Sequence, residues 1–390
     1  MNKVVLPDAG NDIRHDNVPS TLPPLKLAVN GRFLTRSMSG VDRVAQELLR
    51  AMSLHGDTGQ TPLQPRVLLP HAPGILDQNK SDALDGLNIQ PSRRLAGHAW
   101  EQLELPSMRH PGEWLFNPCN TGPVFGARQA HMIHDAQFLT LSEGYSWKFR
   151  TLYRFLMPTL AKRAAALFTV SEFSRRELED LGIFPRNKAI VVHNGCDHMD
   201  RITADPETLS RFDLNAGKYF IALGNLAAHK NLDMVLKAVL RADLDIPIVL
   251  AGGSSPDVFK TIGIADSPKI KVLGRVTDAE LKALLSHATA LVFPSKTEGF
   301  GLPPLEAMRC DCPVIATTGG AVPEVCGDAP LYADPDKPEE WIEAMERVAR
   351  SSELRKELTE RGRRRAATFT WEKAARRIET ALRDADTDLK

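Results

Sequence analysis

Short apolar runs alternate with amphipathic stretches in the first half of the chain. Helical spacing of apolar positions predicts helices at residues 41–52, 147–166 and 172–181. Brief apolar or β-branched runs predict strands at residues 25–30, 114–117, 132–134, 167–170 and 189–193. Strands that alternate with helices favour a mostly parallel sheet with helices on both faces.

The same alternation begins again after a polar, unpatterned stretch at residues 200–217. Strands are predicted at residues 219–223, 248–251, 270–273, 290–293 and 314–316, and helices at 231–240, 278–287, 303–310 and from 338 onward. The chain is therefore expected to form two α/β domains. Ligands bind outside the carboxyl ends of parallel strands, so two facing sheets would share one cleft that holds the chemistry.

These patterns divide the chain into four parts. Residues 1–24 are polar and unpatterned and are expected to be a mobile leader. The first domain is expected at residues 25–205 and the second at 206–370. Residues 371–390 are expected to form an amphipathic helix that crosses back to the first domain.

Composition and charge exclude several classes of protein. The 390 residues include 49 Lys and Arg against 49 Asp and Glu, which argues against a polycation that binds nucleic acid. No apolar run approaches the roughly 18–20 residues that span a bilayer, and acidic residues stand where a signal peptide would need an apolar core. We therefore expect a cytoplasmic protein. Cys310 and Cys312 are expected to be reduced, partly buried thiols, because no second pair completes a zinc site.

The segment at residues 293–308 carries the strongest chemical signal. An apolar strand is followed by the turn Gly299-Phe300-Gly301 and by Pro303, which suits the first turn of a helix. A helix start preceded by glycines binds anions. Glu298 and Glu306, which are separated by seven residues, lie on either side of this site. Because carboxylates repel phosphate, we expect this pair to accept hydrogen bonds from sugar hydroxyls.

Positive charge is expected after the first strand of the second domain. Lys230 and His229 stand at the start of a predicted helix, where a cation is unfavourable to the helix itself. An ammonium group that reaches a bound diphosphate explains Lys230 better than a solvated charge does. Asn225 could add a hydrogen bond, and Gly252 permits close approach of a ligand, although a bare Gly-Gly pair is weak evidence.

Polar residues also follow the strands of the first domain. His134 and Asp135 stand at the end of a strand, although a lone histidine is more often structural. Ser171 is favoured as a helix N-cap, and Gly40 opens the first long helix. The chain has no G-x-S-x-G, P-loop or G-x-G-x-x-G motif, which weakens hydrolase, kinase and dehydrogenase interpretations.

Together these motifs resemble those of the family 4 retaining glycosyltransferases, from residue 25 onward. The Glu298 and Glu306 pair with the intervening Gly-Phe-Gly is the most specific motif. The other matching segments, in the expected order, are 39–43 (SGVDR), 133–135 (IHD), 169–174 (TVSEFS), 192–195 (VHNG) and 229–231 (HKN). The resemblance implies the GT-B architecture, an α/β fold in which two Rossmann-like domains face each other across a cleft.

The resemblance also implies roles for individual residues. Glu306 would hold the nucleotide ribose, Glu298 the hydroxyls of the donor sugar, and Lys230 the diphosphate. The remaining expected site residues are Gly299, Phe300, Gly301 and Leu302 at the helix start, His134 near the transfer centre, and Gly40 on the phosphate and acceptor side. Many relatives carry an Arg shortly before the Lys, whereas this chain has Asn225 to His229 there, so the diphosphate clamp is weaker or uses His229.

The implied reaction transfers a hexose from a nucleoside diphosphate sugar with retention and without a bound metal or other cofactor. The stretches 29–33 and 133–154 resemble bacterial mannosyltransferases that build exopolysaccharide or O-antigen units on polyprenyl diphosphate. GDP-mannose is therefore the favoured donor, with UDP-glucose or another UDP-sugar as the alternative. A sugar-nucleotide epimerase of the same architecture and an inactive scaffold in a polysaccharide assembly complex are the rival interpretations.

One basic stretch bears on the location of the protein. Residues 145–170 contain Lys148, Arg150, Arg154, Lys162 and Arg163 and no acidic residue. Such a segment could rest on anionic lipid at the inner face of the cytoplasmic membrane, although a helix pair packed on the sheet with a solvated basic face is the favoured explanation.

Overall fold

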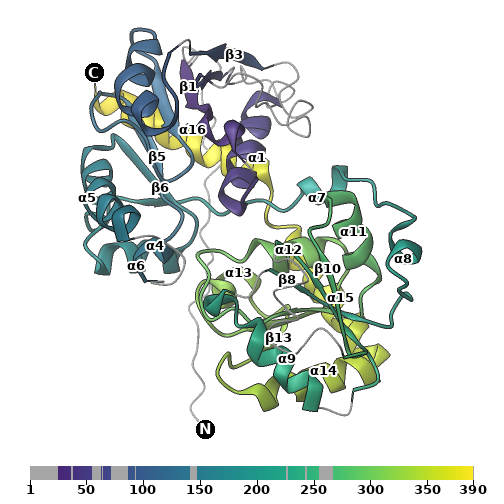
Figure 1. The fold of residues 1–390 in the computed structure, drawn as a ribbon. Coiled ribbons are helices and arrows are strands. Elements are labelled where there is room, and N and C mark those ends of the chain that lie inside the picture. The colour runs from purple at the N-terminus through teal and green to yellow at the C-terminus, as the bar shows by residue number, and fades with distance from the viewer. Residues whose placement is uncertain are drawn as a thin grey trace.

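The computed structural model describes residues 25–36, 38–54, 63, 65–71, 87–92, 94–140, 147–224, 227–241, 244–253 and 267–389. The predicted leader at residues 1–24 and Asn225 lie outside this set. The described chain forms two α/β domains, one above the other in Figure 1. Within the described ranges, no helix has the length and apolar character needed to cross a membrane.

The first domain is built on a parallel sheet with seven strands among the described residues, in the order β3-β2-β1-β4-β5-β6-β7. Their bounds are β1 Leu27–Asn30, β2 Arg66–Leu69, β3 Asn88–Pro91, β4 Trp114–Asn117, β5 Gln129–Met132, β6 Ala166–Thr169 and β7 Ile190–Val191. Its helices are η1 Gly31–Thr35, α1 Gly40–Leu54, α3 Gly97–Ala99, η3 Trp100–Glu104, η4 Leu105–Met108, α4 Gln137–Thr140, α5 Trp147–Arg163 and α6 Glu172–Asp180.

The second domain has a parallel sheet with six described strands, in the order β10-β9-β8-β11-β12-β13. Their bounds are β8 Phe220–Leu223, β9 Ile248–Ala251, β10 Ile270–Gly274, β11 Ala290–Phe293, β12 Val314–Thr317 and β13 Leu331–Ala333. The helices that connect, cover and follow it are α7 His198–Arg201, α8 Thr208–Arg211, η5 Ala228–Lys230, α9 Leu232–Arg241, α11 Asp278–His287, α12 Leu302–Arg309, α13 Val322–Cys326, α14 Pro338–Arg350, α15 Ser352–Ala366 and α16 Trp371–Asp388.

Both sheets reverse their strand order at one point. The reversal lies between β1 and β4 in the first sheet and between β8 and β11 in the second. In open parallel sheets, ligands bind at such a point, outside the carboxyl ends of the strands. The predicted two-domain α/β architecture is confirmed.

Helix α16 returns the chain to the first domain. It runs in yellow behind the upper domain in Figure 1 and packs against α1 and β6. Its buried positions recur at helical spacing, as the amphipathic pattern predicted, and are Trp371, Ala374, Ala375, Ile378, Ala381 and Leu382. The indole of Trp114, at the start of β4, donates a hydrogen bond to Asp386 at 3.2 Å. The end of the chain is thus part of the core of the first domain.

Several predicted boundaries were wrong. Strand β5 occupies Gln129–Met132 instead of 132–134, because the buried polar side chains of Gln129 and His131 hide the strand from an apolar pattern. Helix α5 ends at Arg163 because the chain enters β6 at Ala166. The short strands β2, β3 and β13 were not predicted, and α7 and α8 contribute helical turns at or within the stretch taken as unpatterned.

Candidate functional site

An ion pair joins the two loops at the reversal point of the second sheet. Lys230 ends η5 after β8, and Glu298 lies in the loop after β11. The Nζ atom of Lys230 lies 2.8 Å from Oε1 of Glu298, and their side chains are 25% and 12% exposed. The structure therefore brings together the cation and one of the carboxylates that the sequence singled out.

Asn231 explains why these two loops keep their positions. Its backbone has φ 56°, a left-handed conformation that asparagine tolerates, and it ends the turn that carries Lys230. Its side-chain amide donates to the carbonyls of Pro294 at 3.2 Å and Pro335 at 2.7 Å. The N–H of Lys296 donates to the carbonyl of His229 at 2.8 Å. The loops after β8 and β11 therefore form one connected unit.

Helix α12 begins at this unit. Gly301, at its N-cap, has φ 95°, which requires glycine or costs strain, and Pro303 follows in the first turn. Phe300 is buried, and its ring lies 6.0 Å from the ring of Phe369. The N-cap of α12, Gly301, therefore lies three residues after Glu298 along the chain.

Gly299 contacts the first domain directly. Its carbonyl accepts hydrogen bonds from the hydroxyls of Ser171 at 2.6 Å and Ser174 at 2.9 Å. A Cβ atom at Gly299 would lie 2.8 Å from the Cβ of Asp135, so only glycine fits against the end of β5. The Ser171 hydroxyl also accepts from the N–H of Ser174 at 2.9 Å, which confirms its predicted role as N-cap of α6.

Glu324 makes a second contact between the domains. Its carboxylate accepts the N–H groups of Glu172 at 2.8 Å and Phe173 at 2.9 Å, at the start of α6, and lies 3.1 Å from Nε2 of His193. Burial alone would raise the pKa of Glu324, but these hydrogen bonds outweigh it and hold the pKa below its usual value. Sequence reasoning missed Glu324, although it follows β12 and the Gly319-Gly320 pair.

Glu306 lines a pocket between the domains. It lies in α12, and its Oε1 atom is 3.1 Å from Nε2 of His198. The pocket, of about 240 Å³, is also lined by Gly40 and Arg43 of α1 and by Leu302. No described atom lies within 4 Å of the point where a side chain at Gly40 would begin, apart from its own neighbours, so there is room beside it. Two predicted residues of different domains therefore share one pocket.

His134 and Asp135 approach the Glu298 loop from the first domain. Burial lowers the pKa of His134 to about 4, so its ring is neutral at pH 7. Its Nε2 atom lies 2.7 Å from the carbonyl of Pro118, which can only accept, so the ring proton is on Nε2. Burial raises the pKa of Asp135 to about 6, the N–H of Gln137 opposes the rise, and the Glu298 carboxylate adds to it.

Comparison with known proteins identifies the family. The description Glycosyl transferases group 1 matches residues 208–365, and Glycosyltransferase Family 4 matches residues 116–199. An O-antigen chain mannosyltransferase B of Escherichia coli is 31% identical over 258 residues, which are 63% of this chain and 67% of the relative. The chain belongs to glycosyltransferase family 4. A Salmonella typhimurium O-antigen chain mannosyltransferase, RfbU, is 28% identical over 56% of this chain and 60% of its own length.

Solved structures agree with this family 4 fold. A sucrose-phosphate synthase from Thermosynechococcus elongatus superposes with a TM-score of 0.71 at 14% identity, covering 93% of this chain and 99% of that one. Anabaena HepE in complex with UDP and glucose gives a TM-score of 0.70 at 16% identity, covering 92% and 99%. The architecture of this glycosyltransferase is therefore GT-B, as the resemblance implied.

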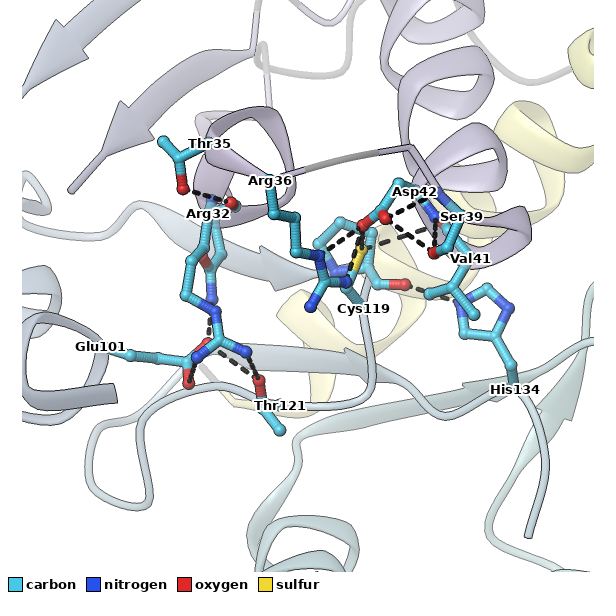
Figure 2. A network of polar contacts seen from close by, with 12 residues as sticks. Arg32, Thr35, Arg36, Ser39, Val41, Asp42, Glu101, Cys119, Thr121 and His134 are labelled. Atoms are coloured by element: carbon cyan, nitrogen blue, oxygen red, sulfur yellow. Dashed lines mark hydrogen bonds and ion pairs between the residues drawn. The ribbon is translucent and has the colours of Figure 1, made fainter. Parts of the chain in front are cut away.

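The first domain of the glycosyltransferase contains a charged pair that the sequence analysis did not single out. Figure 2 shows the guanidinium of Arg36 resting on the buried carboxylate of Asp42. Its Nε and Nη2 atoms donate to Oδ1 of Asp42 at 2.9 and 2.6 Å. The N–H and hydroxyl of Ser39 donate to Oδ2 at 2.9 and 2.6 Å. Asp42 thereby connects the loop after β1 to the start of α1.

A second buried carboxylate, Glu101, lies beside this pair (Figure 2). It accepts from Asn30 at 2.8 Å and Thr121 at 3.0 Å, and lies 3.1 Å from His98 and 3.4 Å from Arg32. Burial alone would raise the pKa of Glu101, but the hydrogen bond with His98 and the charge of Arg32 lower it. These contacts join the loops after β1 and β4 at the reversal point of the first sheet. The sequence did contain a signal for these contacts, because Arg32 and Arg36 both stand in the loop that begins at Gly31 after the first strand.

The remaining predicted residues have plainer surroundings. A Cβ at Gly252 would lie 2.2 Å from the carbonyl oxygen of Gly224, so this glycine is needed for packing between two loops. Burial and the neighbouring Lys230 lower the pKa of His229. Cys310 and Cys312 are free and buried. Among the described residues, no three His, Cys, Asp or Glu side chains are arranged to hold a metal ion.

Proposed function

We propose that this family 4 glycosyltransferase transfers mannose from GDP-mannose, with retention at the anomeric carbon, to a saccharide linked to polyprenyl diphosphate. The product would be a cell-surface polysaccharide such as an O-antigen. Mannose and the acceptor class are supported by the relatives named O-antigen mannosyltransferases. The observation that carries the donor assignment is the pair of carboxylates on either side of the α12 start, Glu298 paired with Lys230 and Glu306 with His198.

The donor would bind between these groups. Glu306 faces the pocket next to Gly40 and would accept hydrogen bonds from the ribose, while Glu298 would accept them from the sugar. Lys230 and the backbone N–H groups at the start of α12, in residues 299–302, would receive the diphosphate. His229 has a lowered pKa and is neutral at pH 7, so the cationic part of the clamp would rest on Lys230.

The reaction would break the bond between the anomeric carbon and the diphosphate oxygen. The acceptor hydroxyl would form the new bond on the same face of the sugar, and its proton would pass to a phosphate oxygen of the leaving diphosphate. Stabilisation of that leaving group by Lys230 and by oriented N–H groups would supply most of the rate enhancement. The neutral His134 could accept a hydrogen bond through Nδ1, which would orient a sugar hydroxyl near the transfer centre. No metal is required in this scheme.

The surface around α5 would rest on the inner face of the cytoplasmic membrane. Trp147, Phe155 and Phe125 are 72%, 71% and 70% exposed, and the guanidinium of Arg163 lies 4.8 Å from the ring centre of Phe125. Large exposed aromatic side chains next to cations are typical of segments that bind anionic lipid. Such a contact would bring the acceptor site close to a lipid-linked substrate.

A donor panel tests the proposed function. Purified protein is incubated with labelled GDP-mannose or UDP-glucose, a membrane lipid extract and EDTA, and label is counted in the lipid-linked fraction. We expect label from GDP-mannose, an α-linked product by NMR, and loss of transfer in Glu298→Gln.

Other outcomes are equally informative. Transfer from UDP-glucose alone would replace the donor assignment, and loss in EDTA that added metal restores would contradict the metal-free scheme. Interconversion of nucleotide sugars without a new glycosidic bond would indicate an epimerase. No transfer by folded protein, with normal polysaccharide in cells that carry Lys230→Ala, would indicate a scaffold.

A further inference from the structure

A buried histidine separates the Glu306 carboxylate from the last helix of the chain. His198 is 2% exposed, and its Nε2 atom lies 3.1 Å from Oε1 of Glu306. On its other side, Nε1 of Trp371 donates a hydrogen bond to Nδ1 of His198 at 3.1 Å. Three side chains from α12, α7 and α16 thus form one chain of hydrogen bonds.

The indole of Trp371 determines the direction in which these hydrogen bonds run. An indole N–H can only donate, so Nδ1 of His198 must accept and carries no proton. The ring proton of the neutral histidine is therefore on Nε2, where it donates to Glu306. The carboxylate keeps its remaining lone pairs for other partners, because an ionised carboxylate offers about four acceptor sites. One oxygen of Glu306 is held by the protein while the carboxylate faces the pocket.

This chain of hydrogen bonds lies where the polypeptide crosses between the domains. His198 follows the segment that leaves the first domain, and Trp371 begins the helix that returns to it. The two crossing segments are joined by hydrogen bonds from the N–H of Cys196 to the carbonyl of Phe369 at 3.1 Å and from the N–H of Trp371 to Asp197 at 2.8 Å. A Cβ at Gly195 would lie 2.2 Å from the backbone nitrogen of Trp371, so the segments are in close contact. These contacts fix the position of His198 relative to the two segments that cross between the domains.

We propose that His198 is a positioning residue for donor binding: it orients the Glu306 carboxylate toward the ribose hydroxyls, and Trp371 fixes the tautomer in which it does so. The inference rests on the proposed binding of the ribose by Glu306. Without the hydrogen bond from His198, the Glu306 carboxylate would sample other rotamers and would have to be reoriented each time a nucleotide binds. Replacing His198 should therefore raise the Kd only of nucleotides whose ribose carries its hydroxyls.

Binding of matched nucleotides tests this role. The probes are GDP and UDP, each compared with its 2′,3′-dideoxy analogue by isothermal titration calorimetry. For the wild-type protein we expect the dideoxy analogue of the better ligand to bind more than tenfold more weakly. In His198→Leu we expect the Kd of the ribose form to rise about tenfold and that of the dideoxy form to change less than twofold. The exposed His287→Leu is the control and should change neither value.

The outcomes separate the inference from the proposed function. If His198→Leu weakens binding of the ribose form and the dideoxy form equally, the role of His198 is purely structural. If the Kd of neither form changes, His198 has no role in binding. Either result overturns the inference and leaves donor binding intact. Failure of wild-type protein to bind any of these nucleotides would instead overturn the proposed function and the inference with it.

A measurement on the wild-type protein covers the case in which His198→Leu does not fold. Long-range ¹H–¹⁵N spectra of protein labelled in histidine, assigned with the Trp371→Phe variant, report the tautomer of His198. We expect the proton on Nε2 in the wild-type protein, and a proton on Nδ1 would overturn the inference.

Discussion

The Nζ atom of Lys230 lies 2.8 Å from Oε1 of Glu298, and this ion pair links the loops at the two sides of the sheet reversal. Each group neutralises the other while both are largely buried, so neither is left as an uncompensated charge in the cleft. In the proposed function, the phosphates of the donor would contact Lys230 and its sugar hydroxyls would contact Glu298, so donor binding would divide this pair.

Replacing the two partners should have different consequences. Glu298→Gln should lower kcat for transfer about 100-fold, because an interaction with the reacting sugar is lost, with a small effect on GDP binding. Lys230→Met should lower kcat by a similar factor and also raise the Kd for GDP about tenfold, because a charge-assisted contact to phosphate is lost. Steady-state kinetics and calorimetry check both variants. Equal losses of GDP affinity in the two variants would contradict the assignment of different roles.

Asp135 should make stability depend on pH. Its pKa of about 6 lies above its usual value of 3.8, so the folded protein binds a proton that the unfolded chain has lost. This contribution to stability is present below about pH 4 and is lost as the pH rises through 6. Asp135→Asn stays neutral, so its Tm should match that of the wild-type protein at pH 4 and exceed it at pH 7 to 8.

Differential scanning calorimetry across pH 4 to 8 measures this difference. The exposed Asp180→Asn is the matched control, because Asp180 is 70% exposed and lies 3.5 Å from Arg186 at the surface. Its difference from the wild-type protein should be small over the whole range. A Tm difference for Asp135→Asn that does not change with pH would contradict the raised pKa.

Glu324 should stabilise the contact between the domains. Glu324→Gln keeps the shape of the side chain but loses the negative charge at the start of α6, at an expected cost of about 1 kcal/mol at pH 7. The pKa of Glu324 is lowered in the folded state, so its contribution is present above the usual value of 4.5 and is lost as the pH falls through the folded pKa. Thermal unfolding at pH 7 and pH 3 checks this: the variant should differ from the wild-type protein only at pH 7. A variant as stable as the wild-type protein at pH 7 would contradict it.

The α5 surface should bind anionic vesicles. We expect the protein to float with vesicles that contain phosphatidylglycerol and to stay unbound with pure phosphatidylcholine vesicles, with binding reduced by 0.5 M salt because screening weakens the attraction. Trp147→Ser with Phe155→Ser should reduce flotation about tenfold. Leu54→Ser is the control, because this side chain is 61% exposed at the end of α1 and is not part of α5. Equal flotation of all variants would exclude this surface as the contact.

Much of the fold and part of the site could be predicted from local patterns. The alternation of short apolar runs with amphipathic stretches indicated both sheets. It misplaced β5, where Gln129 and His131 make the strand polar, and it missed β2, β3 and β13. Glu298, Glu306 and Lys230 were singled out as candidate site residues because they stand at or near helix starts that follow parallel strands, and the structure places Lys230 beside Glu298. His134 was singled out because it follows a strand, and it lies two residues beyond the observed end of β5.

The sequence by itself determined the two-domain α/β architecture and the family, and it singled out Glu298, Glu306 and Lys230 as candidate site residues. Only the tertiary structure decided which partners those groups have. His198 and Trp371 are 173 residues apart, and Asn30 and Glu101 are 71 residues apart, yet each pair is joined by a hydrogen bond. Periodicity and motif spacing depend on neighbours along the chain, whereas the protonation of Asp135 and the tautomer of His198 depend on burial and on side chains that folding brings from other elements.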